Sequence, residues 1–502
     1  MNAKISERLR LAATASGLLL LLVIIQLGQA QRILGDRVYD RSISNLYFTV
    51  NARYQTLELT WRNFDDPNGF IVLTKDFPIS GFQRKLKHKK RSLGHLLQQL
   101  LNPLPIIMPV PPDMSFISFV PHKLMFNREI ITRQTDIEWE YDARDEYGQR
   151  KKKVLFAYKP THTNGWTKTG IFFNRDRMDL RVNITTSCYG YYAYFISEHG
   201  SIRSEYCMKL YPTWMNDLRS HLGQFRMRDL FLPGTHDSAA YIKNFIYQPM
   251  DDVPTKYTFT QDDDIRQQLL LGVRYIDLRV GYYQSDPSNQ FWANHGIAKC
   301  HPLMPILRQV RDYAMETKEI IVLDVQEFPV GFGKDYTIHD KLINLLNDSL
   351  AEVMADSIYG WGQSLEKIWA RNKTVIVCYD HEYGLRTYPH LLWPATEHKW
   401  GEVRSMEALK SYLFRMHKLP EYSSRPVTDM AELTPDPVGI VMDHYGGLRK
   451  MADSVNRFVT EWYFEELGPT TNIVAVDFVR GTNIVDAAIY WNLKRAFYRP
   501  KK

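Results

Sequence analysis

The sequence predicts an α/β fold: a TIM-type β/α barrel, complete or incomplete, preceded by an N-terminal β-sandwich. First, the chain has 502 residues, which is too long for one ordinary hydrophobic core and favours two domains. Second, near residue 215 short strand-like segments give way to apolar strands that alternate with helical stretches. A composition of 44% hydrophobic and 24% charged residues excludes a fibrous or largely disordered chain. The net charge of +7 is too small to indicate a nucleic-acid partner.

The first thirty residues predict a secretory signal peptide. A basic start is followed by the apolar run LAATASGLLLLLVIIQL and by Gly28-Gln29-Ala30, a small-x-small cleavage pattern. The alternative is a signal-anchored membrane protein, because the apolar run approaches the roughly 20 residues that span a bilayer. No second such run follows in the sequence. We therefore expect a secreted, extracellular protein that is soluble or peripherally bound to a membrane.

Sequons and cysteines fit the same compartment. Three N-x-S/T sequons allow N-glycosylation; they are Asn183, Asn347 and Asn372. Cys188 and Cys207 flank a predicted hairpin that turns near residues 198–200, and in an oxidising compartment we expect them to form a disulfide. The other two cysteines, Cys300 and Cys378, form either a second disulfide or two buried thiols.

The segment 33–210 predicts the antiparallel sandwich. Segments such as LYFTVNARYQTLELTW, GFIVLTKDF, KTGIFFN and YGYYAYFISE are rich in β-branched and aromatic residues, and Asp, Asn, Pro and Gly separate them. Two basic runs, 85–91 and 150–153, are expected to be loops. Such runs are usually solvated, and at the surface of a secreted protein they could also meet anionic headgroups or glycans.

The segment 215–502 predicts the barrel. Its strands are apolar throughout, as expected for parallel strands buried on both faces, and helical stretches separate them. Seven such strands are recognisable: RDLFLPGTHD, VRYIDLRV, FWANHG, EIIVLDVQEF, TVIVCYD, VGIVMDH and NIVAVDFV. In a TIM-type barrel the catalytic residues lie at the C-terminal ends of the strands.

Polar residues gather at those predicted strand ends. They are His236 and Asp237 after the first strand, Asp277 and Arg279 in the second, His295 after the third, Gln326 and Glu327 ending the fourth, and Asp477 ending the last. One such residue alone is more often a structural group or a helix cap. Together, however, they supply a base, an acid and a cation, which are the groups that phosphoryl transfer requires.

These residues fall in segments that resemble the X domain of phosphatidylinositol-specific phospholipases C. The matching segments are LPGTHDSAAY, LGVRYIDLRV, ANHG and EIIVLDVQEF. Within that superfamily the chain looks most like the secreted arthropod proteins that carry only an X domain and an N-terminal β-domain. The resemblance implies that 215–502 is a TIM-barrel catalytic domain. It also implies a phosphoric diester hydrolase that cleaves an inositol phospholipid, or a related phosphodiester, to a diacylglycerol-like alcohol and a cyclic phosphate.

The resemblance also implies roles for single residues. His236 matches the general base that deprotonates the inositol 2-hydroxyl, and His295 matches the general acid that protonates the leaving oxygen. Arg279 matches the arginine that stabilises the transition state in metal-independent members. Asp237 is expected to assist His295, and Asp477 to hold the second ring nitrogen of His236.

The remaining polar residues are expected to bind the substrate; they are Asp277, Gln326 and Glu327, of which Asp277 also positions Arg279. Bacterial members carry lysines near the end of the fourth strand to grip the headgroup, whereas this chain has Val325-Gln326-Glu327. The resemblance therefore supports the reaction type better than it supports one headgroup.

Arg279 also bears on the cofactor. Calcium-dependent members offer an acid-x-acid pair in the second strand, where oxygen ligands surround the cation. This chain has Asp277-Leu278-Arg279, and a guanidinium at the second position would repel a cation while supplying positive charge itself. We therefore expect no metal cofactor. The alternative is a displaced calcium site formed by Asp237, Asp277 and Glu327.

Two other functions stay open at the level of sequence. One is a non-catalytic secreted protein that binds a phospholipid headgroup or a cell surface, although it would be expected to lose one of the two histidines or Arg279. The other is a metal-dependent glycerophosphodiester or sphingomyelin phosphodiesterase, which would need a cluster of acids for magnesium. The loop 391–400 carries Trp393 and Trp400, which either rest at a lipid interface or pack in the core.

Overall fold

The structure is a computed structural model that describes residues 46–75, 154–174, 184–198, 201–242, 252–334, 336–419 and 423–498. Several sequence predictions lie outside these residues. They are the signal peptide at 1–30, the basic runs at 85–91 and 150–153, and the sequon at Asn183. No helix within the described ranges is long and apolar enough to cross a membrane.

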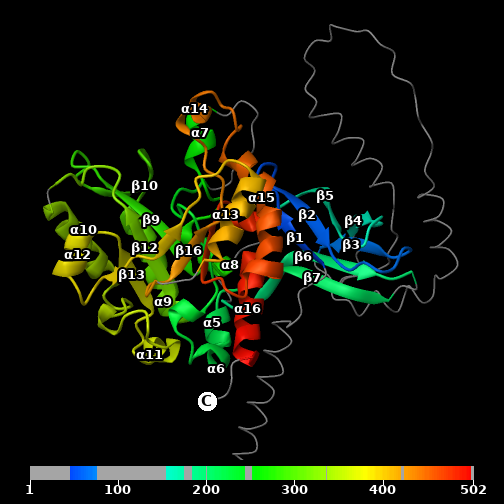
Figure 1. Cartoon of the computed structure of the whole chain (residues 1–502), viewed down its shortest axis with the longest axis horizontal. Helices are drawn as coiled ribbons and strands as arrows, with labels where there is room; N and C mark the ends of the chain where they lie inside the picture. The colour runs from blue at the N-terminus through cyan, green and yellow to red at the C-terminus, as the bar shows by residue number, and fades with distance from the viewer. Residues whose placement is uncertain are drawn as a thin grey trace, which may run out of the picture.

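The N-terminal part forms two antiparallel sheets (Figure 1). One sheet has the order β1-β2-β5 and the other β4-β3-β6-β7. Their strands are β1 (Leu46–Val50), β2 (Thr56–Trp61), β3 (Phe70–Thr74), β4 (Val154–Tyr158), β5 (Gly165–Phe172), β6 (Ser187–Ile196) and β7 (Ile202–Leu210). β-Branched and aromatic side chains fill the interior, since β1 and β3 are buried at every position. The predicted N-terminal antiparallel sheets are confirmed.

The predicted hairpin and its disulfide are also present. Strands β6 and β7 pair antiparallel, and Cys188 on β6 is bonded to Cys207 on β7. The remaining cysteines, Cys300 and Cys378, are free thiols. Of the two alternatives for that pair, the structure therefore has the thiols.

The C-terminal part is a curled parallel sheet with the strand order β14-β13-β12-β9-β8-β17-β16-β15. Its strands are β8 (Leu232–Thr235), β9 (Tyr275–Tyr282), β12 (Ile321–Glu327), β13 (Val375–Tyr379), β14 (Trp393–Pro394), β15 (Glu397–Lys399), β16 (Val427–Met430) and β17 (Ile473–Val476). Neighbours along this order pair parallel, whereas β14 and β15 form no ladder with each other. The barrel fold is confirmed in its incomplete form. Strands β14 and β15 have too few residues to stand out as apolar runs in the sequence.

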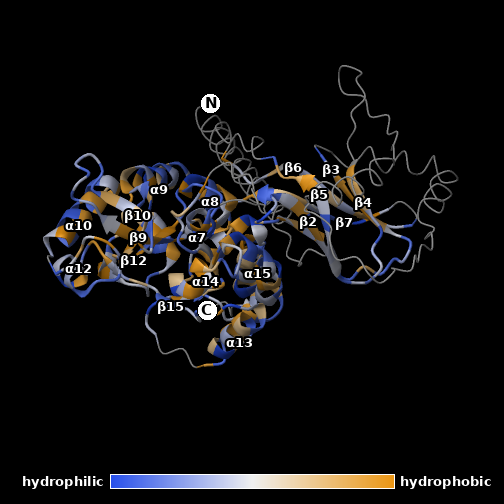
Figure 2. Ribbon diagram, turned by 90° about the horizontal axis from the view of Figure 1, so that it is seen from above, coloured by the Kyte–Doolittle hydropathy of each residue, from blue (hydrophilic) through white to orange (hydrophobic). Residues whose placement is uncertain are grey.

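Helices cover the outside of this sheet. They are α5 (Trp214–Asp217), α6 (Arg219–Leu222), α7 (Val253–Thr258), α8 (Ile265–Leu271), α9 (Leu303–Thr317), α10 (Thr337–Leu350), α11 (Leu365–Ala370), α12 (Glu382–Thr387), α13 (Met406–Met416), α14 (Pro437–Val441), α15 (Leu448–Trp462) and α16 (Ile484–Tyr498). Short helical turns are η2 (Met227–Asp229), η3 (Ser357–Tyr359), η4 (Tyr463–Leu467) and η5 (Val479–Gly481). Figure 2 shows both hydrophilic and hydrophobic residues on these helices, as expected for amphipathic helices packed on a sheet.

Capping residues fix where the helices begin and end. The side chain of Asp264 accepts a hydrogen bond from the Gln267 backbone at the start of α8, and Gly272 ends that helix with a φ of 117°. An acceptor side chain satisfies one of the free N–H groups of a first turn, and a glycine adopts the left-handed conformation without steric cost. The chain then enters β9 directly, which brings Asp277 and Arg279 to the far end of the sheet.

The strand that ends at His295 differs from the sequence prediction. Strand β10 (Phe291–His295) is not a parallel barrel strand, because it pairs antiparallel with β9 and with β11 (Ala298–Pro302). The connections are too short for a parallel arrangement: only residues 283–290 separate β9 from β10, whereas a parallel crossover needs a dozen or more. Gly296 makes the tight turn with a φ of 51°. His295 therefore lies at the tip of a hairpin.

A second predicted strand is in fact a helix. The segment VGIVMDH contains α14, and the barrel strand is instead the preceding VTDM, β16. Asp436 accepts a hydrogen bond from the Gly439 backbone, and Pro437 occupies the first turn. An acidic N-cap followed by proline is a helix-start signal that outweighs the apolar run.

The two parts of the molecule are packed against each other, with α15 facing the antiparallel sheets (Figures 1 and 2) and η5 in contact with β1. Arg449 on α15 donates to the backbone oxygen of Ala52 (3.0 Å) and to the carboxylate of Asp262 (2.6 Å). Gln55 also donates to Asp262, at 3.2 Å. A buried polar network thus joins the first hairpin of the N-terminal part to the barrel.

Candidate active site

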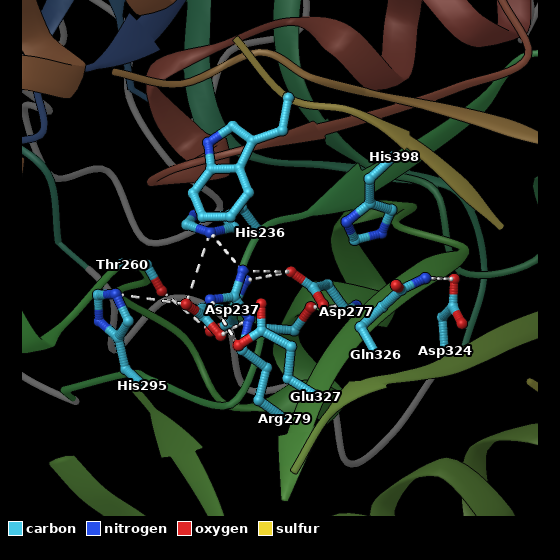
Figure 3. Close-up of polar contacts among 12 residues, drawn as sticks. His236, Asp237, Thr260, Asp277, Arg279, His295, Asp324, Gln326, Glu327 and His398 are labelled. Atoms are coloured by element: carbon cyan, nitrogen blue, oxygen red, sulfur yellow. Dashed lines mark hydrogen bonds and ion pairs between the residues drawn. The ribbon is translucent and has the colours of Figure 1, made fainter. Parts of the chain in front are cut away.

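The predicted polar residues meet at the C-terminal end of the parallel sheet (Figure 3). His236 directly follows β8, Arg279 lies within β9, Glu327 ends β12 and Asp477 directly follows β17. These strands are neighbours in the sheet, so their ends present side chains to one small volume. His295 reaches the same volume from the β10–β11 hairpin.

The turn after β8 is tightly held. Asp237 has a φ of 39°, and the carboxylate of Asp277 accepts its backbone N–H at 3.0 Å. The backbone N–H of His236 bonds to Val476 of the neighbouring strand. Positive φ is uncommon for a residue other than glycine, and such strained positions concentrate at functional sites. Gly234 lets this turn approach β9, because a Cβ there would lie 2.7 Å from the ring of Tyr275.

The hydrogen bonds of His236 leave Nε2 as an acceptor, as a general base requires. Its Nδ1 lies 2.9 Å from the carboxylate of Asp477, and its Nε2 lies 3.1 Å from Nη2 of Arg279. A carboxylate accepts and a guanidinium can only donate, so Nδ1 carries the proton and Nε2 accepts. Because tautomers are assigned from such partners, this geometry corresponds to a neutral ring with a free Nε2 lone pair.

The partners of His295 give it the form of an acid. Its Nδ1 donates to the backbone oxygen of Thr258 at 2.7 Å, since a carbonyl oxygen can only accept. Its Nε2 faces Oδ2 of Asp237 at a distance of 3.3 Å. The same Asp237 oxygen lies 3.5 Å from Nε2 of His236. The two rings are perpendicular, at 83°, with centroids 6.2 Å apart.

Arg279 lies among three carboxylates and one aromatic ring. Its Nε is 2.9 Å from Asp237, its Nη2 is 3.7 Å from Asp277 and its Nη1 is 3.6 Å from Glu327. The ring of Trp400 covers the guanidinium at 5.6 Å. Burial alone would lower the pKa of Arg279, but the neighbouring carboxylates, Asp237 first, raise it above its usual value. Arg279 is therefore a fixed positive charge.

The same ion pairs bear on the displaced calcium site. Asp237, Asp277 and Glu327 are the three acids that could hold a cation, and each of them faces the guanidinium of Arg279. A second cation among these oxygens would be repelled at short range. In the part of the chain that the structure describes, no group of three or more His, Cys, Asp or Glu side chains has the arrangement of a metal site. Arg279 therefore opposes the binding of a cation by these three carboxylates.

Glu432 is an acid that the sequence prediction missed. It follows β16 by two residues and is 3% exposed. Its carboxyl group interacts electrostatically with His236, Asp477, Arg279 and Asp277, the charged residues of the site. The misassigned strand explains the omission, because VTDM was not recognised as a barrel strand and Glu432 therefore did not stand out as a residue near a strand end.

The charges around His236 oppose each other. Burial lowers the pKa of the ring, while Glu432, Asp477 and Asp237 raise it, to about 10 in total. That value favours a charged ring, whereas the hydrogen bond from Arg279 requires a neutral one. Burial also raises the pKa of Glu432, to about 8, and a protonated Glu432 withdraws the largest of the negative charges that raise the pKa of His236. A neutral His236 is thus compatible with a protonated Glu432, and we adopt this form because a guanidinium cannot accept a hydrogen bond.

Two other predicted side chains are placed less centrally. Gln326 donates to Asp324 at 2.8 Å and to the backbone oxygen of Thr396 at 3.3 Å, and Figure 3 shows it turned toward Asp324 rather than toward His295. Trp393 is fully buried, so it packs in the core. Trp400 instead lies beside His236, with ring centroids 6.4 Å apart.

No family model matches the chain. Curated relatives do: PI-PLC X domain-containing protein 1 of Homo sapiens is 25% identical over 325 residues, covering 60% of this chain and 98% of that protein. The protein of the same name from Mus musculus is 26% identical and covers 56% of this chain and 86% of its own length. PI-PLC X domain-containing protein 3 of Homo sapiens is 23% identical and covers 56% and 92%.

Two solved structures are also similar. The F249X mutant of the phosphatidylinositol-specific phospholipase C of Staphylococcus aureus has a TM-score of 0.40 and 15% identity, covering 56% of this chain and 97% of that one. The phosphatidylinositol-specific phospholipase C of Listeria monocytogenes has a TM-score of 0.41 and 15% identity, covering 57% and 98%. By sequence, over more than half of its length, the chain is similar to the PI-PLC X domain-containing proteins.

Proposed function

We propose that the chain is a phosphoric diester hydrolase of the phospholipase C type that cleaves an inositol phospholipid or a related phosphodiester. The observation that carries the proposal is the pair of histidines with complementary hydrogen-bond partners. His236 has an accepting Nε2, and His295 has a proton on Nδ1 and a carboxylate facing Nε2. A base and an acid that face the same small volume are what a displacement at phosphorus needs.

In the proposed reaction, Nε2 of His236 takes the proton of a headgroup hydroxyl adjacent to the phosphate. That oxygen attacks phosphorus and closes a cyclic phosphate, while the bond from phosphorus to the lipid alcohol breaks. His295 gives its Nε2 proton to the departing oxygen. Arg279 neutralises the charge that develops on the phosphoryl oxygens, and Asp477 keeps the ring of His236 oriented and stabilises its charged form. Water then opens the cyclic ester with the roles of the two histidines reversed.

We further propose that this chemistry uses no metal ion. The support is that Arg279 contacts each carboxylate of the alternative calcium site and supplies the positive charge itself. The proposed magnesium-dependent alternatives lack support for the same reason. The guanidinium stands where their acid cluster would be needed.

We propose in addition that the protein is secreted and acts at a membrane surface. Support comes from the basic start, the apolar run and Gly28-Gln29-Ala30 in the sequence, and from the Cys188–Cys207 disulfide. Protein recovered from the medium of a eukaryotic host should begin at or near Gln31. An intact Met1, found only in membrane fractions, would contradict this.

The test of the proposed reaction is phosphorus NMR of the products formed from phosphatidylinositol in mixed micelles, with a chelator present. We expect a cyclic inositol phosphate, and a rate at least about 10²-fold lower for His236→Ala and for His295→Ala, the usual cost of losing a positioned base or acid. His390→Ala, which replaces an exposed histidine, is the control. Activity that appears only when calcium is restored would contradict the metal-free reaction. Headgroup binding without turnover would favour the non-catalytic alternative.

A further inference from the structure

Two carboxylates from the two parts of the chain meet beside the turn between β1 and β2. Glu58 lies on β2 and Asp453 lies on α15, which packs next to these strands (Figure 1). Nδ2 of Asn51 donates to Oε1 of Glu58 at 2.7 Å and also to Oδ1 of Asp453. Asn51 and Glu58 are buried, so water does little to screen the two acids from each other. The docking of α15 on the N-terminal sheets thus brings two acidic groups together.

The turn itself fixes the amide group of Asn51 between the two acids. Its Oδ1 accepts the backbone N–H groups of Arg53 and Tyr54, at 3.0 and 2.8 Å. An amide oxygen accepts and an amide nitrogen donates, so these two bonds turn Nδ2 toward the carboxylates. Two oxygens that accept from one nitrogen lie at most about 6 Å apart. Carboxylates that close together disfavour the state in which both are ionised.

Positively charged side chains around the pair reduce this repulsion but do not remove it. Lys168 on β5 lies 4.0 Å from Glu58, and its side chain is 50% exposed. Arg53 in the turn and Arg457 on α15 also act on Asp453, and like Lys168 they lower its pKa. Burial and the negative charge of Glu58 outweigh these three cations. The pKa of Asp453 is therefore raised from its ordinary value of 3.8 to about 6.

We propose that Asp453 and Glu58 form a pH-dependent latch between the N-terminal sheets and the barrel, which holds most tightly when the pair has taken up a proton. A protonated carboxyl group no longer repels its neighbour, and Nδ2 of Asn51 remains a donor to both. Because the pKa of Asp453 is higher in the folded protein than in the unfolded chain, this stabilisation is complete below pH 3.8 and is lost as the pH rises through about 6. The latch goes beyond the proposed reaction and does not depend on it.

The test compares the thermal stability of the full chain and of Asp453→Asn at about pH 5 and about pH 7.5, on either side of the pKa of Asp453. Asparagine cannot ionise, but its oxygen still accepts from Asn51. Between the two pH values the Tm of the wild type, measured by calorimetry, should fall by at least about 1 °C more than the Tm of the variant. Glu466→Gln, at an exposed glutamate, is the matched control and should keep the pH dependence of the wild type. Parallel changes of Tm in the wild type and Asp453→Asn would overturn the latch.

Two further measurements test whether the acids act as a pair. Glu58→Gln should flatten the pH dependence as Asp453→Asn does, and it takes its place should that variant fail to fold. The double variant should behave like either single one, because removing one acid already ends the repulsion. Effects that add in the double variant would mean that the two acids titrate independently, and would overturn the latch. In the wild type alone, hydrogen-exchange protection of residues 46–61, corrected for the intrinsic exchange rate, should fall roughly 10-fold between the same pH values. Unchanged protection would contradict the latch without the use of any variant.

Discussion

At the scale of single residues, Asp237 stands between the two histidines. Its Oδ2 is 3.3 Å from Nε2 of His295 and 3.5 Å from Nε2 of His236, and its Oδ1 pairs with Arg279. Since His236 already has Asp477 on its other nitrogen, Asp237 matters more to the acid than to the base. In the proposed reaction, the neighbouring positions 236 and 237 therefore act on opposite sides of the scissile bond.

This division of roles predicts how a good leaving group changes the effect of each substitution. A leaving group of low pKa needs little protonation, so a nitrophenyl ester should largely restore the rate of His295→Ala and Asp237→Asn. It should leave His236→Ala at least about 10²-fold below the wild type. The measurement is kcat on the lipid and on the nitrophenyl substrate for each variant. Equal rescue of all three variants would show that the assignment of acid and base is wrong.

Sequence reached these residues because each follows a strong apolar strand. His236 and Asp477 directly follow β8 and β17, and Arg279 lies within β9; all three strands are buried throughout and easily recognised. Glu432 and Trp400 could not be predicted to lie in the site, because they follow β16 and β15, which have only four and three residues. Their place in the site depends on the curvature of the whole sheet, which no local pattern encodes.

At the scale of elements, α14 presents apolar side chains to solvent. Val438, Val441 and Met442 are 72%, 77% and 74% exposed. Asp443 joins this segment to α7 through an ion pair with Lys256 and a hydrogen bond from Tyr257, and Figure 1 shows α7 and α14 together at one end of the molecule. The last residue of α7, Thr258, accepts the hydrogen bond of His295. The exposed apolar helix is therefore connected to the candidate active site through the polar contacts of α7.

We expect α14 to insert into the lipid interface. Replacing Val438, Val441 and Met442 by serine should weaken binding to phosphatidylinositol-containing vesicles at least 10-fold, because each apolar side chain contributes roughly 1 kcal/mol when it leaves water in part. Turnover of a soluble nitrophenyl substrate should stay within about 2-fold. Ile358→Ser is the control, since Ile358 is 60% exposed but lies in η3, next to the start of β13 at the other end of the barrel. Equal losses for the control and the triple variant, in a vesicle sedimentation assay, would contradict the role of α14.

Helices and strands could be predicted where both the length and the periodicity of the hydrophobic pattern indicated the same element. They could not be predicted where a short connection determined the local structure. The helices α9 and α15 each run for 15 residues with one buried face, and both stand in stretches predicted to be helical. The β10–β11 hairpin and α14 were misassigned because an apolar run of five to seven residues fits a strand, a hairpin arm or a short helix equally well. The hairpin is determined by the short loop before β10 and by Gly296, and α14 is determined by the N-cap Asp436 followed by Pro437.

At the scale of the whole molecule, the antiparallel sheets and the barrel share one continuous hydrophobic core. Polar contacts reinforce this junction. Arg457 on α15 covers the ring of Trp166 on β5 at 3.8 Å, and Arg449 holds Asp262 and the first hairpin. The change near residue 215 from short strands to alternating strands and helices predicts two domains. The sequence pattern indicates the type of each element, but it does not indicate which faces of the two domains pack together. We expect the described molecule to unfold as one cooperative unit.

The substitution Arg449→Met tests whether the N-terminal sheets and the barrel unfold as one cooperative unit. Arg449 and Asp262 are both buried, and removing one partner of a buried ion pair typically costs about 3–5 kcal/mol because the other charge stays in a dry environment. The N-terminal sheets and the barrel should therefore lose stability together, so that calorimetry shows a single transition at a Tm several degrees lower. Arg457→Met removes a more exposed contact across the same junction, worth roughly 0.5–1 kcal/mol, and should lower Tm much less. Two separate transitions in the wild type, with only the smaller one moved by Arg449→Met, would mean that the sheets and the barrel fold independently and that Arg449 stabilises only their docking.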